Sequence, residues 1–588
     1  MNAVIPSPTE HAAEGGAGSL AAAGPWRVRA DRSLSEVTET VRALLAPHLG
    51  ARLLPDGDPR EHRSEIVLAL DATGVPPART VGVAPAGTAE PADEAYALTV
   101  GADGITCRAR TPEGVFRAAT SAAQLLLTTP PDGAIEAQRL RDAPHYAWRG
   151  LMIDPARSFV TPDEVRQVID LAALYKLNVL HLHLTDNEGW RLAVPSLPAL
   201  TAGADTSGPG VSDPDASTAG VSDPGTSTAG VSDPGASTSP AFYSADEYRA
   251  LQAYAARRFV TMVPEIDLPG HCAALRAALP DLPPAPAPEG LAGRYPFVPP
   301  LDLADAATHS AVSAVLADVC ALTDGPFVHI GCDEAVGITA DAFHVAVNEL
   351  RRITRKFGKR PVAWQESSRA GAGPEDIAQF WVDVPMMDLP GSAEELAARP
   401  ELTASGMTME IASALRSFFA PSDHDVERVL AGGGRLLLSP QSHLYLDRRY
   451  SAEVTPPGQA EAATRLGFPH YLPRDVRHTA SWDPASHGIP DESVAGVEAT
   501  LFGETLRSID DLTTLLLPRL GSVAETAWSG RPPLWAEYRG RIARHAPLWR
   551  ERGLVHFAAE DVPWGGTFAH TDMSRLLRED DPHSLRYI

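Results

Sequence analysis

Two adjacent acidic residues, Asp333 and Glu334, end a strand-like run in the segment FVHIGCDEA at residues 327–335. Neighbouring side chains on a regular strand point to opposite faces, so both acids can enter one site only where the pleat stops. Barrel enzymes carry their chemistry at this end of the strands. A carboxylate pair there suits general acid–base catalysis, although a single pair is also typical of an ordinary polar loop.

Further acids end other strand-like segments of the chain. They are Asp154, Asp186, Asp267, Glu366, Asp383 and Glu504. An acid that recurs at the end of most strands is hard to explain by loop solvation alone, because in a barrel all these ends meet at one rim. Two kinds of site are consistent with this pattern, a metal centre and a glycoside hydrolase site.

The metal alternative rests on histidines. His181 and His183 are two residues apart in the segment HLHL, so a strand would place both on the same face, with His271 and several aspartates as further ligands. The later segments PVAWQE and IAQFWVD carry no histidine where metal-dependent barrel hydrolases supply more ligands. Buried histidines satisfied by hydrogen bonds are the commoner explanation, and we expect no metal and no cofactor.

The glycosidase alternative rests on aromatic residues beside the acids. They are Trp190, Trp364, Trp381, Tyr445 and Phe502. Ligand sites combine apolar and aromatic walls with a few fixed polar groups, and sugar rings stack their apolar faces on such walls. Each of these residues could instead belong to the core, but their place at predicted strand ends favours a carbohydrate site.

The elements that would position these residues alternate along the chain. Eight segments are predicted as strands: WRGLMID, VLHLHLTD, FVTMVPEID, FVHIGCDE, PVAWQE, IAQFWVD, RLLLSP and VEATLFGE. Helical patterns such as TPDEVRQVIDLAALYKL and SADEYRALQAYAARR lie between them. Eight alternating units predict an α/β fold of the (β/α)8 TIM-barrel type, preceded by a small α+β domain.

The domain boundaries follow from composition. Residues 1–24 are small, polar and rich in Pro and Gly, and are predicted to be a disordered tail. Residues 25–143 contain short β-type runs and one helical pattern that starts at Thr111 and Pro112, and form the α+β domain. Residues 144–588 form the catalytic barrel. A ten-residue repeat without large apolar side chains predicts a flexible insertion at 201–240.

The charge balance limits the partners of the protein. The 588-residue chain has a formal net charge of −25, which argues against binding to nucleic acid or to an anionic membrane. The four cysteines show no CxxC spacing, so neither a zinc site nor a disulfide framework is predicted. The first residues have no signal-peptide pattern, and we expect a cytoplasmic protein unless a secretion signal was trimmed away. The oligomeric state is left open.

Six motifs give the chain a family resemblance. WRGLMIDPARSFV, HLHLTDNEGWRL, VPEIDLPGH, HIGCDE, YLD and GVEATLFGE occur in this order. They resemble the landmarks of the family-20 glycoside hydrolases, the β-N-acetylhexosaminidases. The resemblance extends from about residue 93 to 530, is interrupted by the repeat, and includes part of the small domain. It implies hydrolysis of terminal, non-reducing β-linked GlcNAc or GalNAc with retention of configuration.

The resemblance also implies catalytic roles. Glu334 would be the general acid and later the general base. The 2-acetamido carbonyl of the substrate would attack the anomeric carbon, which is the substrate-assisted exception to the scheme with two carboxylates. Asp333 would hold the acetamido N–H and balance the charge of the oxazolinium intermediate. Tyr445 would donate a hydrogen bond to the acetamido oxygen.

Binding and supporting roles follow in the same way. Arg149 would bind the 3- and 4-hydroxyls, Asp447 and Glu504 the 4- and 6-hydroxyls. Trp364, Trp381 and Phe502 would wall the sugar, and Asp186, Asp267 and His271 would form a polar network behind Glu334. A buried network without catalytic effect is the alternative for these last three residues.

Three departures from the family pattern affect the fit of the sugar rather than the reaction. Cys332 stands where glycine is usual, Phe502 replaces a tryptophan, and Asn187-Glu188 replaces Asp-Gln. A sugar-binding relative without activity is the rival function. The combination of Asp333, Glu334 and Tyr445 argues against that rival, because a protein that only binds sugar needs no acid.

Overall fold

The computed structural model describes residues 3–13, 18–55, 58, 64–78, 80–202, 241–289, 298–383, 389–404, 407–469 and 471–565. The insertion predicted at 201–240 lies outside the described residues from residue 203 onward. Among the described helices, none has the length and apolar character needed to cross a membrane.

Eight parallel strands close into a barrel. They are β9 Trp148–Ile153, β10 Val179–His183, β11 Thr261–Glu265, β12 Phe327–His329, β13 Arg360–Trp364, β14 Ile377–Phe380, β15 Arg435–Leu438 and β16 Val494–Leu501. β16 pairs with β9 from Gly496↔Trp148 to Leu501↔Ile153, which closes the ring. Each strand lies within or overlaps one of the eight predicted segments, so the predicted TIM barrel is confirmed.

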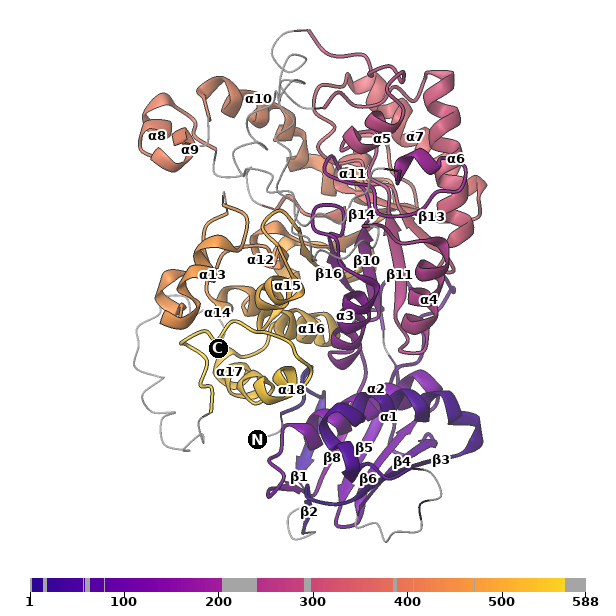
Figure 1. The fold of residues 1–588 in the computed structure, drawn as a ribbon, viewed down its shortest axis with the longest axis vertical. Coiled ribbons are helices and arrows are strands. Elements are labelled where there is room, and N and C mark those ends of the chain that lie inside the picture. The colour runs from indigo at the N-terminus through magenta and orange to yellow at the C-terminus, as the bar shows by residue number, and fades with distance from the viewer. Residues whose placement is uncertain are drawn as a thin grey trace, which may run out of the picture.

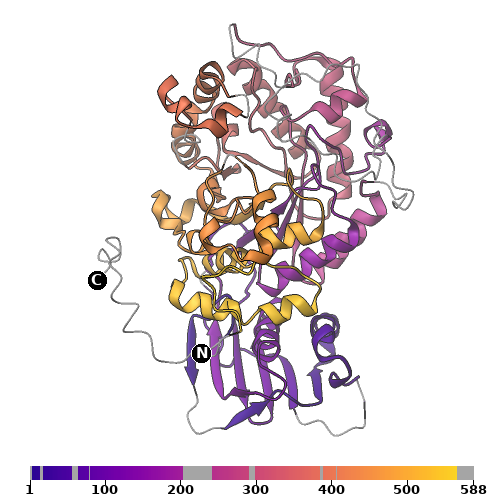
Figure 2. The same cartoon turned by 60° about the vertical axis from the view of Figure 1, so that its left-hand side comes forward.

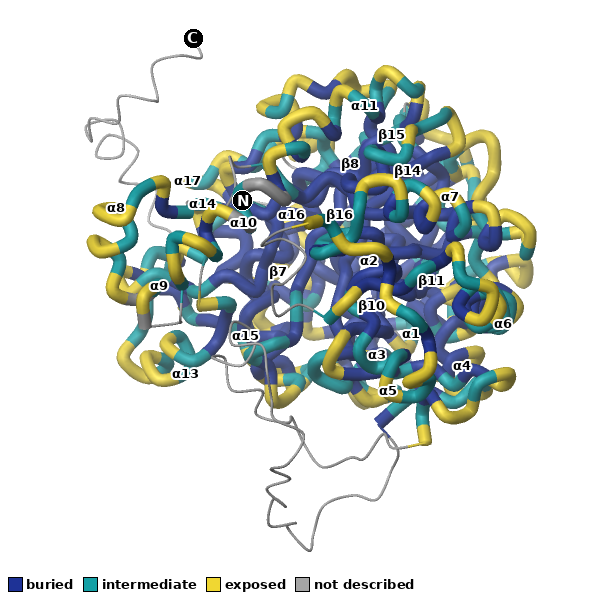
Figure 3. Tube along the Cα trace, turned by 90° about the horizontal axis from the view of Figure 1, so that it is seen from above, coloured by how far each residue is buried: buried dark blue, intermediate teal, exposed yellow. Residues whose placement is uncertain are grey.

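Helices cover the outside of the barrel, and Figure 3 shows buried strands at the centre with exposed segments around them. They include α3 Pro162–Leu174, α4 Ala245–Ala256, α6 Ala306–Leu322, α7 Ala340–Lys356, α15 Ile509–Leu516, α16 Arg519–Ser529 and α17 Trp535–Ala543. Capping boxes start two of them, Thr161 with Glu164 in α3 and Ser244 with Glu247 in α4. Each box satisfies backbone N–H groups that the helix itself leaves without partners.

Other helices lie in the connections. They are α5 Ala273–Ala278, α8 Ala393–Ala397, α9 Pro400–Ala404, α10 Met409–Phe419, α11 Asp425–Ala431, α12 Gln441–Leu444, α13 Ala460–Arg465, α14 Val476–Ala480 and α18 Ala546–Glu551. Helices α8 to α10 project from the barrel end opposite the small domain (Figure 1).

Inside the barrel an apolar layer is followed by a polar one. The early strand residues form a buried apolar cluster: Trp148, Val179, Val263, Phe327, Val362, Ile377, Leu437 and Ala495. Further along the strands the buried side chains are His181, Glu265, His329, Gln379 and Glu498, which hydrogen-bond or pair with one another. A polar layer in a barrel core is costly unless it is fully paired, and it points to a function beyond packing.

The small domain is an α+β unit below the barrel (Figures 1 and 2). Its sheet has the order β1-β8-β5-β6-β4-β3. The strands are β1 Glu10–Ala13, β3 Trp26–Ala30, β4 Ser64–Leu70, β5 Tyr96–Gly101, β6 Gly104–Ala109 and β8 Gln138–Asp142, with β2 Ser19–Ala21 and β7 Ala134–Glu136 as a separate pair. Helices α1 Ser35–Leu49 and α2 Pro112–Leu127 lie between this sheet and the barrel. Thr111 caps α2 as predicted.

The prediction of a disordered tail at residues 1–24 is wrong for the part that the structure describes. Val4 and Ile5 are fully buried, and β1 pairs with β8. The Ile5 backbone N–H donates to Gln124 Oε1 at 2.7 Å, and Gln124 Nε2 donates back to the Ile5 carbonyl at 2.7 Å. These partners lie far away in the sequence, so the local composition does not reveal them.

Candidate active site

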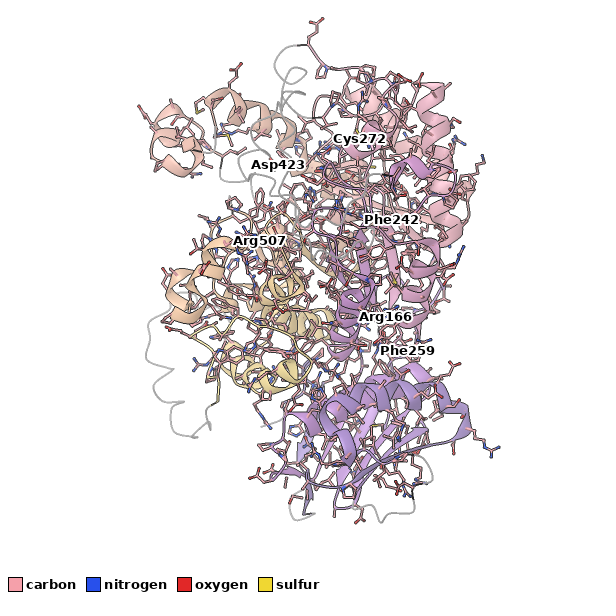
Figure 4. All side chains as sticks on the ribbon, in the orientation of Figure 1. Arg166, Phe242, Phe259, Cys272, Asp423 and Arg507 are labelled. Carbon is pink, nitrogen blue, oxygen red and sulfur yellow. The ribbon has the colours of Figure 1, made fainter. Side chains whose placement is uncertain are left out.

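Except for Arg149, the predicted site residues gather at the barrel end that points away from the small domain. Phe259, just before β11, lies beside that domain, with its ring 5.5 Å from the Phe116 ring. Cys272, beyond β11, lies at the opposite end (Figure 4). The residues that follow the strands at this end are Asp154, Asp186, Asp267, His271, Asp333, Glu334, Glu366, Asp447, Phe502 and Glu504. One rim therefore carries the predicted chemistry.

The turn after β12 brings both acids to this rim. Gly331, Cys332 and Glu334 have φ values of 66°, 80° and 38°, so the chain leaves the strand pleat before Asp333. A Cβ at Gly331 would lie 1.7 Å from Asp267 Oδ1, which only glycine avoids. Cys332 tolerates the left-handed region with its thiol fully buried. Such backbone strain costs on the order of 1–3 kcal/mol and is concentrated at functional sites.

Glu334 is backed by a histidine and an aspartate. His271 Nε2 lies 3.7 Å from Glu334 Oε2, and His271 Nδ1 lies 3.0 Å from Asp186 Oδ1. Although burial opposes it, Asp186 raises the pKa of His271 to about 10, which favours the imidazolium. Burial raises the pKa of Glu334, and the charges of His271 and Arg157 oppose that rise. Glu334 therefore holds its proton to higher pH than a free glutamate, as a general acid requires.

Asp333 lies in an acidic environment. One of its oxygens, an Asp267 oxygen and a His271 nitrogen all lie within 4.8 Å of one another. Burial and the neighbouring Asp267 raise the pKa of Asp333 well above its usual range. Burial and Glu265 raise the pKa of Asp267 in the same direction. Two close buried carboxyls favour sharing a proton, so a positive charge or an N–H donor beside Asp333 would be strongly stabilised there.

Four aromatic rings form a cluster next to Asp333. The Trp381 and Tyr445 rings are stacked with centroids 6.1 Å apart, the Tyr445 and Phe502 centroids are 5.4 Å apart, and Trp364 lies 6.4 Å from Phe502. Phe419 of α10 packs against the far side, 5.9 Å from Trp381. Trp381 is also held by its indole N–H, which donates to Glu366 Oε2 at 3.1 Å. This cluster contains the three predicted wall residues and Tyr445.

Trp190 and Asp383 do not belong to this aromatic cluster. Trp190 belongs to the main core, and its indole donates to the Leu192 carbonyl at 2.8 Å. Asp383 Oδ1 accepts the Ser442 backbone N–H at 3.1 Å, which ties the loop after β14 to the loop that carries Tyr445.

A second acidic group surrounds Arg157. Its guanidinium is 2.7 Å from Asp186 and 2.9 Å from Asp154, and its Nε lies 3.5 Å from Glu188 and 3.6 Å from Glu504. Burial raises the pKa of Glu504 to about 7 against the effect of Arg157. Burial and Glu504 raise the pKa of the nearby Asp447 to about 8. These groups offer one charged donor and several acceptors to polar hydroxyls.

The prediction for Arg149 is wrong. Arg149 is the second residue of β9, at the barrel end next to the small domain, and it is fully buried. Its guanidinium pairs with Glu94 at 2.5 Å and donates to the Lys176 carbonyl at 2.9 Å. The arginine at the site is Arg157, which follows β9. The position of each arginine relative to the predicted strand carried this signal, because chemistry belongs after a strand and not at its start.

The histidines and acids of the barrel also have the side chains that metals use. Three groups bring such atoms together: His181, Glu265 and His329; His183, Asp186 and Asp267; and Asp267, His271 and Asp333. A ligating imidazole must be neutral. Carboxylates here raise the pKa of His181 to about 9 and that of His183 well above its usual range, although burial opposes both shifts. The charged forms of His181 and His183 therefore favour ion pairing over metal ligation, whereas burial lowers the pKa of His329 and favours its neutral form.

Comparison with known families accounts for nearly the whole chain. The family model described as glycosyl hydrolase family 20, catalytic domain, matches residues 146–531, and the model for domain 2 of that family matches residues 1–143. The β-N-acetylhexosaminidase of Cellulomonas fimi is 34% identical over 491 residues, which cover 81% of this chain and 82% of that protein. A β-hexosaminidase of Akkermansia muciniphila is 28% identical over 77% of this chain and 83% of its own length.

Solved structures agree. A mutant β-hexosaminidase of Streptomyces plicatus in complex with the product GlcNAc has a TM-score of 0.70 at 28% identity and covers 96% of this chain and 98% of its own. The family-20 β-N-acetylhexosaminidase of Streptomyces coelicolor has a TM-score of 0.68 at 28% identity over 96% and 99%. The chain therefore belongs to glycosyl hydrolase family 20.

Proposed function

We propose that the protein is an exo-acting β-N-acetylhexosaminidase that releases terminal β-linked GlcNAc or GalNAc with retention, using the substrate's own acetamide as nucleophile. The observation that carries the proposal is the turn after β12. It directs Glu334 toward His271 and the adjacent Asp333 toward Asp267 within one site. Relatives named as β-N-acetylhexosaminidases support the substrate class.

Glu334 acts first as the acid. Burial raises its pKa, which favours the protonated form, and it donates this proton to the glycosidic oxygen as the bond to the leaving group breaks. The resulting carboxylate then takes a proton from the water that opens the intermediate. His271 and Asp186 stabilise that carboxylate, because an imidazolium lies 3.7 Å from its oxygen.

Asp333 and Tyr445 position the acetamide. The acetamido oxygen attacks the anomeric carbon, and the oxazolinium ion that forms carries a positive charge on the acetamido group. Asp333 accepts the N–H and balances this charge, which offsets the cost of ionising a carboxyl beside Asp267. Tyr445 donates a hydrogen bond from its phenol to the acetamido oxygen, while Trp364, Trp381 and Phe502 fix the group for in-line attack.

Arg157, Asp447 and Glu504 bind the hydroxyls of the sugar. Arg157 takes the role predicted for Arg149, since it lies at the rim with its charge shared among carboxylates. Asp447 and Glu504 have raised pKa values of about 8 and about 7, so near neutral pH they are present in both protonation states and can donate as well as accept. Asp267 supports the site through its contact with the Cys332 backbone N–H at 3.1 Å.

The test compares two aryl glycosides that differ only at C2. The 4-nitrophenyl N-acetyl-β-glucosaminide should be hydrolysed, and NMR should detect the β-anomer of the free sugar first. The matching β-glucoside, which has a plain 2-hydroxyl, should hardly react. Sugar binding without turnover would support a lectin-like protein, and a first-formed α-anomer would exclude a retaining enzyme.

A further inference from the structure

A single buried carboxylate, Glu265 at the end of β11, connects two parts of the site. Glu265 is fully buried, and the family resemblance assigns it no role in this chain. Its Oε2 lies 2.5 Å from His183 Nδ1 and 3.2 Å from His181 Nε2. Its Oε1 accepts the Trp364 indole N–H at 2.8 Å and lies 2.8 Å from His329 Nδ1. The two oxygens therefore belong to two separate sets of contacts. The contacts of Oε2 form the acid branch, and those of Oε1 form the acetamide branch.

The first branch leads to the acid. His183 Nε2 lies 2.8 Å from Asp186 Oδ2, and the other oxygen of Asp186 contacts His271, the partner of Glu334. Carboxylates and imidazoles alternate along this path, and every group before His271 is almost completely buried. Each doubly held imidazole is fixed in rotation by the carboxylate on either side.

The same alternation continues away from the rim. His181 Nδ1 lies 2.8 Å from Glu498 Oε1, and Glu498 also accepts the Trp148 indole N–H at 3.0 Å and a Gln379 amide N–H at 3.1 Å. Through His181 and Glu498, Glu265 is thus held by residues next to the apolar layer inside the barrel. A carboxylate held from several strands has little freedom to shift, so it can set the position of the groups that it binds.

The second branch leads to the aromatic cluster. Trp364 is 1% exposed and contacts both Trp381 and Phe502, with ring centroids 6.5 Å and 6.4 Å away. The bond to Glu265 is the only hydrogen bond of its indole N–H among the described residues. Rotation of Trp364 about its side-chain bonds would disturb the wall that faces the acetamide.

We propose that Glu265 is a positioning residue that couples the two halves of the reaction: through His183 and Asp186 it orients His271 against Glu334, and through the Trp364 indole it fixes the acetamide wall. This inference rests on the proposed function. It goes beyond the Asp186 and His271 support of Glu334, because it makes acid catalysis and acetamide binding depend on one carboxylate in the barrel core.

Two readouts separate the branches. Damage to the acid branch should reduce kcat/KM more for poor leaving groups than for activated aryl groups, because only the former need full protonation. Damage to the acetamide branch should weaken binding of GlcNAc-thiazoline, a mimic of the cyclised intermediate. His271→Gln is the reference for the first effect, and Trp364→Phe, which replaces the indole by a smaller ring without an N–H donor, is the reference for the second.

Glu265→Gln should show both effects together. We expect kcat/KM to fall about tenfold further for chitobiose than for the 4-nitrophenyl substrate, and thiazoline affinity to fall about tenfold, as misplacement of reacting groups by fractions of an ångström commonly costs. In the double variant with His271→Gln, the leaving-group dependence should be no steeper than in His271→Gln alone, because Glu265 acts through His271.

Glu525→Gln is the matched control. Glu525 is also a buried glutamate, but it lies in helix α16, away from the rim. It pairs with Arg541 at 2.6 Å. It should reproduce any general effect of destabilisation, which thermal melts of all variants record. If Glu265→Gln does not fold, Glu265→Asp keeps the charge, cannot reach both branches, and should still show at least the larger loss for chitobiose.

Equal losses for both leaving groups with unchanged thiazoline affinity, as in Glu525→Gln, would overturn the inference. So would an effect of Glu265→Gln on one branch only, or additive leaving-group effects in the double variant. The proposed function fails in a different way, namely if the wild-type protein releases no sugar from either substrate.

Discussion

At the scale of single residues, the two arginines of the segment WRGLMIDPARSFV have different roles, one in the structure and one at the site. Arg149 is buried between the barrel and the small domain, where it pairs with Glu94. Arg157 lies at the rim with four carboxylates around it and its guanidinium 5.4 Å from the Phe502 ring. The motif alone does not distinguish them, because both are arginines within one short stretch. The bounds of β9 decide, since only Arg157 follows the strand.

Substituting each arginine should separate binding from stability. Arg157→Gln should lower kcat/KM by about 10–100-fold, mainly through KM, because charge-assisted hydrogen bonds to the sugar are lost. Arg149→Gln should lower the free energy of unfolding by about 3–5 kcal/mol, since Glu94 loses one of its two buried arginine partners. The Arg149→Gln protein that remains folded should keep the wild-type KM. Steady-state kinetics and denaturant melts of both variants test this, and a raised KM in Arg149→Gln with normal stability would restore the original assignment.

Removal of the acid should give a result that depends on the leaving group. Glu334→Gln cannot donate a proton to the glycosidic oxygen, so kcat/KM for chitobiose should fall by about 10²–10⁴-fold. Activated aryl glycosides need less protonation and should lose less, while the affinity for GlcNAc-thiazoline should stay close to that of the wild type. Equal losses across a series of leaving groups would show that Glu334 is not the acid.

At the scale of elements, the strands were predictable and the polar interior was not. Most of the strands are apolar runs followed by an acid, and that pattern predicts both the barrel and the rim. Glu265 and Glu498 lie inside the runs TMVPE and VAGVEATL, and their partners His181, His183 and Trp364 lie on other strands. Pairing between strands depends on barrel register, which the local pattern does not contain. The cysteine itself gives no sign of the left-handed turn at Cys332; only the family resemblance, in which glycine is usual there, pointed to this position.

The loop after β11 should control the pH dependence through His271. Its imidazolium, with a pKa of about 10, lowers the pKa of Glu334 against the effect of burial. His271→Gln removes this charge, so the pKa of Glu334 should rise. Activity needs protonated Glu334 and is lost as pH rises through that pKa, so the basic limb of kcat/KM should move to higher pH. A pH–rate profile measures the shift, and a basic limb that stays in place or moves to lower pH would contradict the assigned contact.

At the scale of the whole molecule, the first residues tie the small domain to the end of the barrel chain. The Arg541 guanidinium donates to the Val4 carbonyl at 3.0 Å, and His545 Nε2 lies 2.8 Å from the Ala3 carbonyl. Figure 1 shows the N-terminus beside α17 and α18. The composition of residues 1–24 predicts disorder, because only contacts with residues more than a hundred positions away order the first few. The composition of this segment therefore could not show its contribution to stability.

Deletion of residues 1–13 should therefore destabilise the protein rather than leave it unchanged. Burial of Val4 and Ile5 contributes about 1.5–3 kcal/mol for each side chain, so the free energy of unfolding should fall by about 3 kcal/mol or more. Glu10→Ala is the control, because the Glu10–Arg141 pair is largely exposed and contributes little. Thermal melts decide, and a deletion variant with wild-type stability would support the disordered tail.

The central claim is that the substrate's acetamide, and not Asp333, is the nucleophile. The most direct measurement is kcat/KM of the wild-type protein on aryl glycosides whose N-acetyl group carries zero to three fluorines. Fluorine withdraws electron density from the attacking carbonyl oxygen, while the leaving group and the protein stay the same. We expect kcat/KM to fall steadily from the acetyl to the trifluoroacetyl substrate. A flat series, or a covalent sugar adduct trapped on Asp333 by a 2-fluoro glycoside, would contradict it.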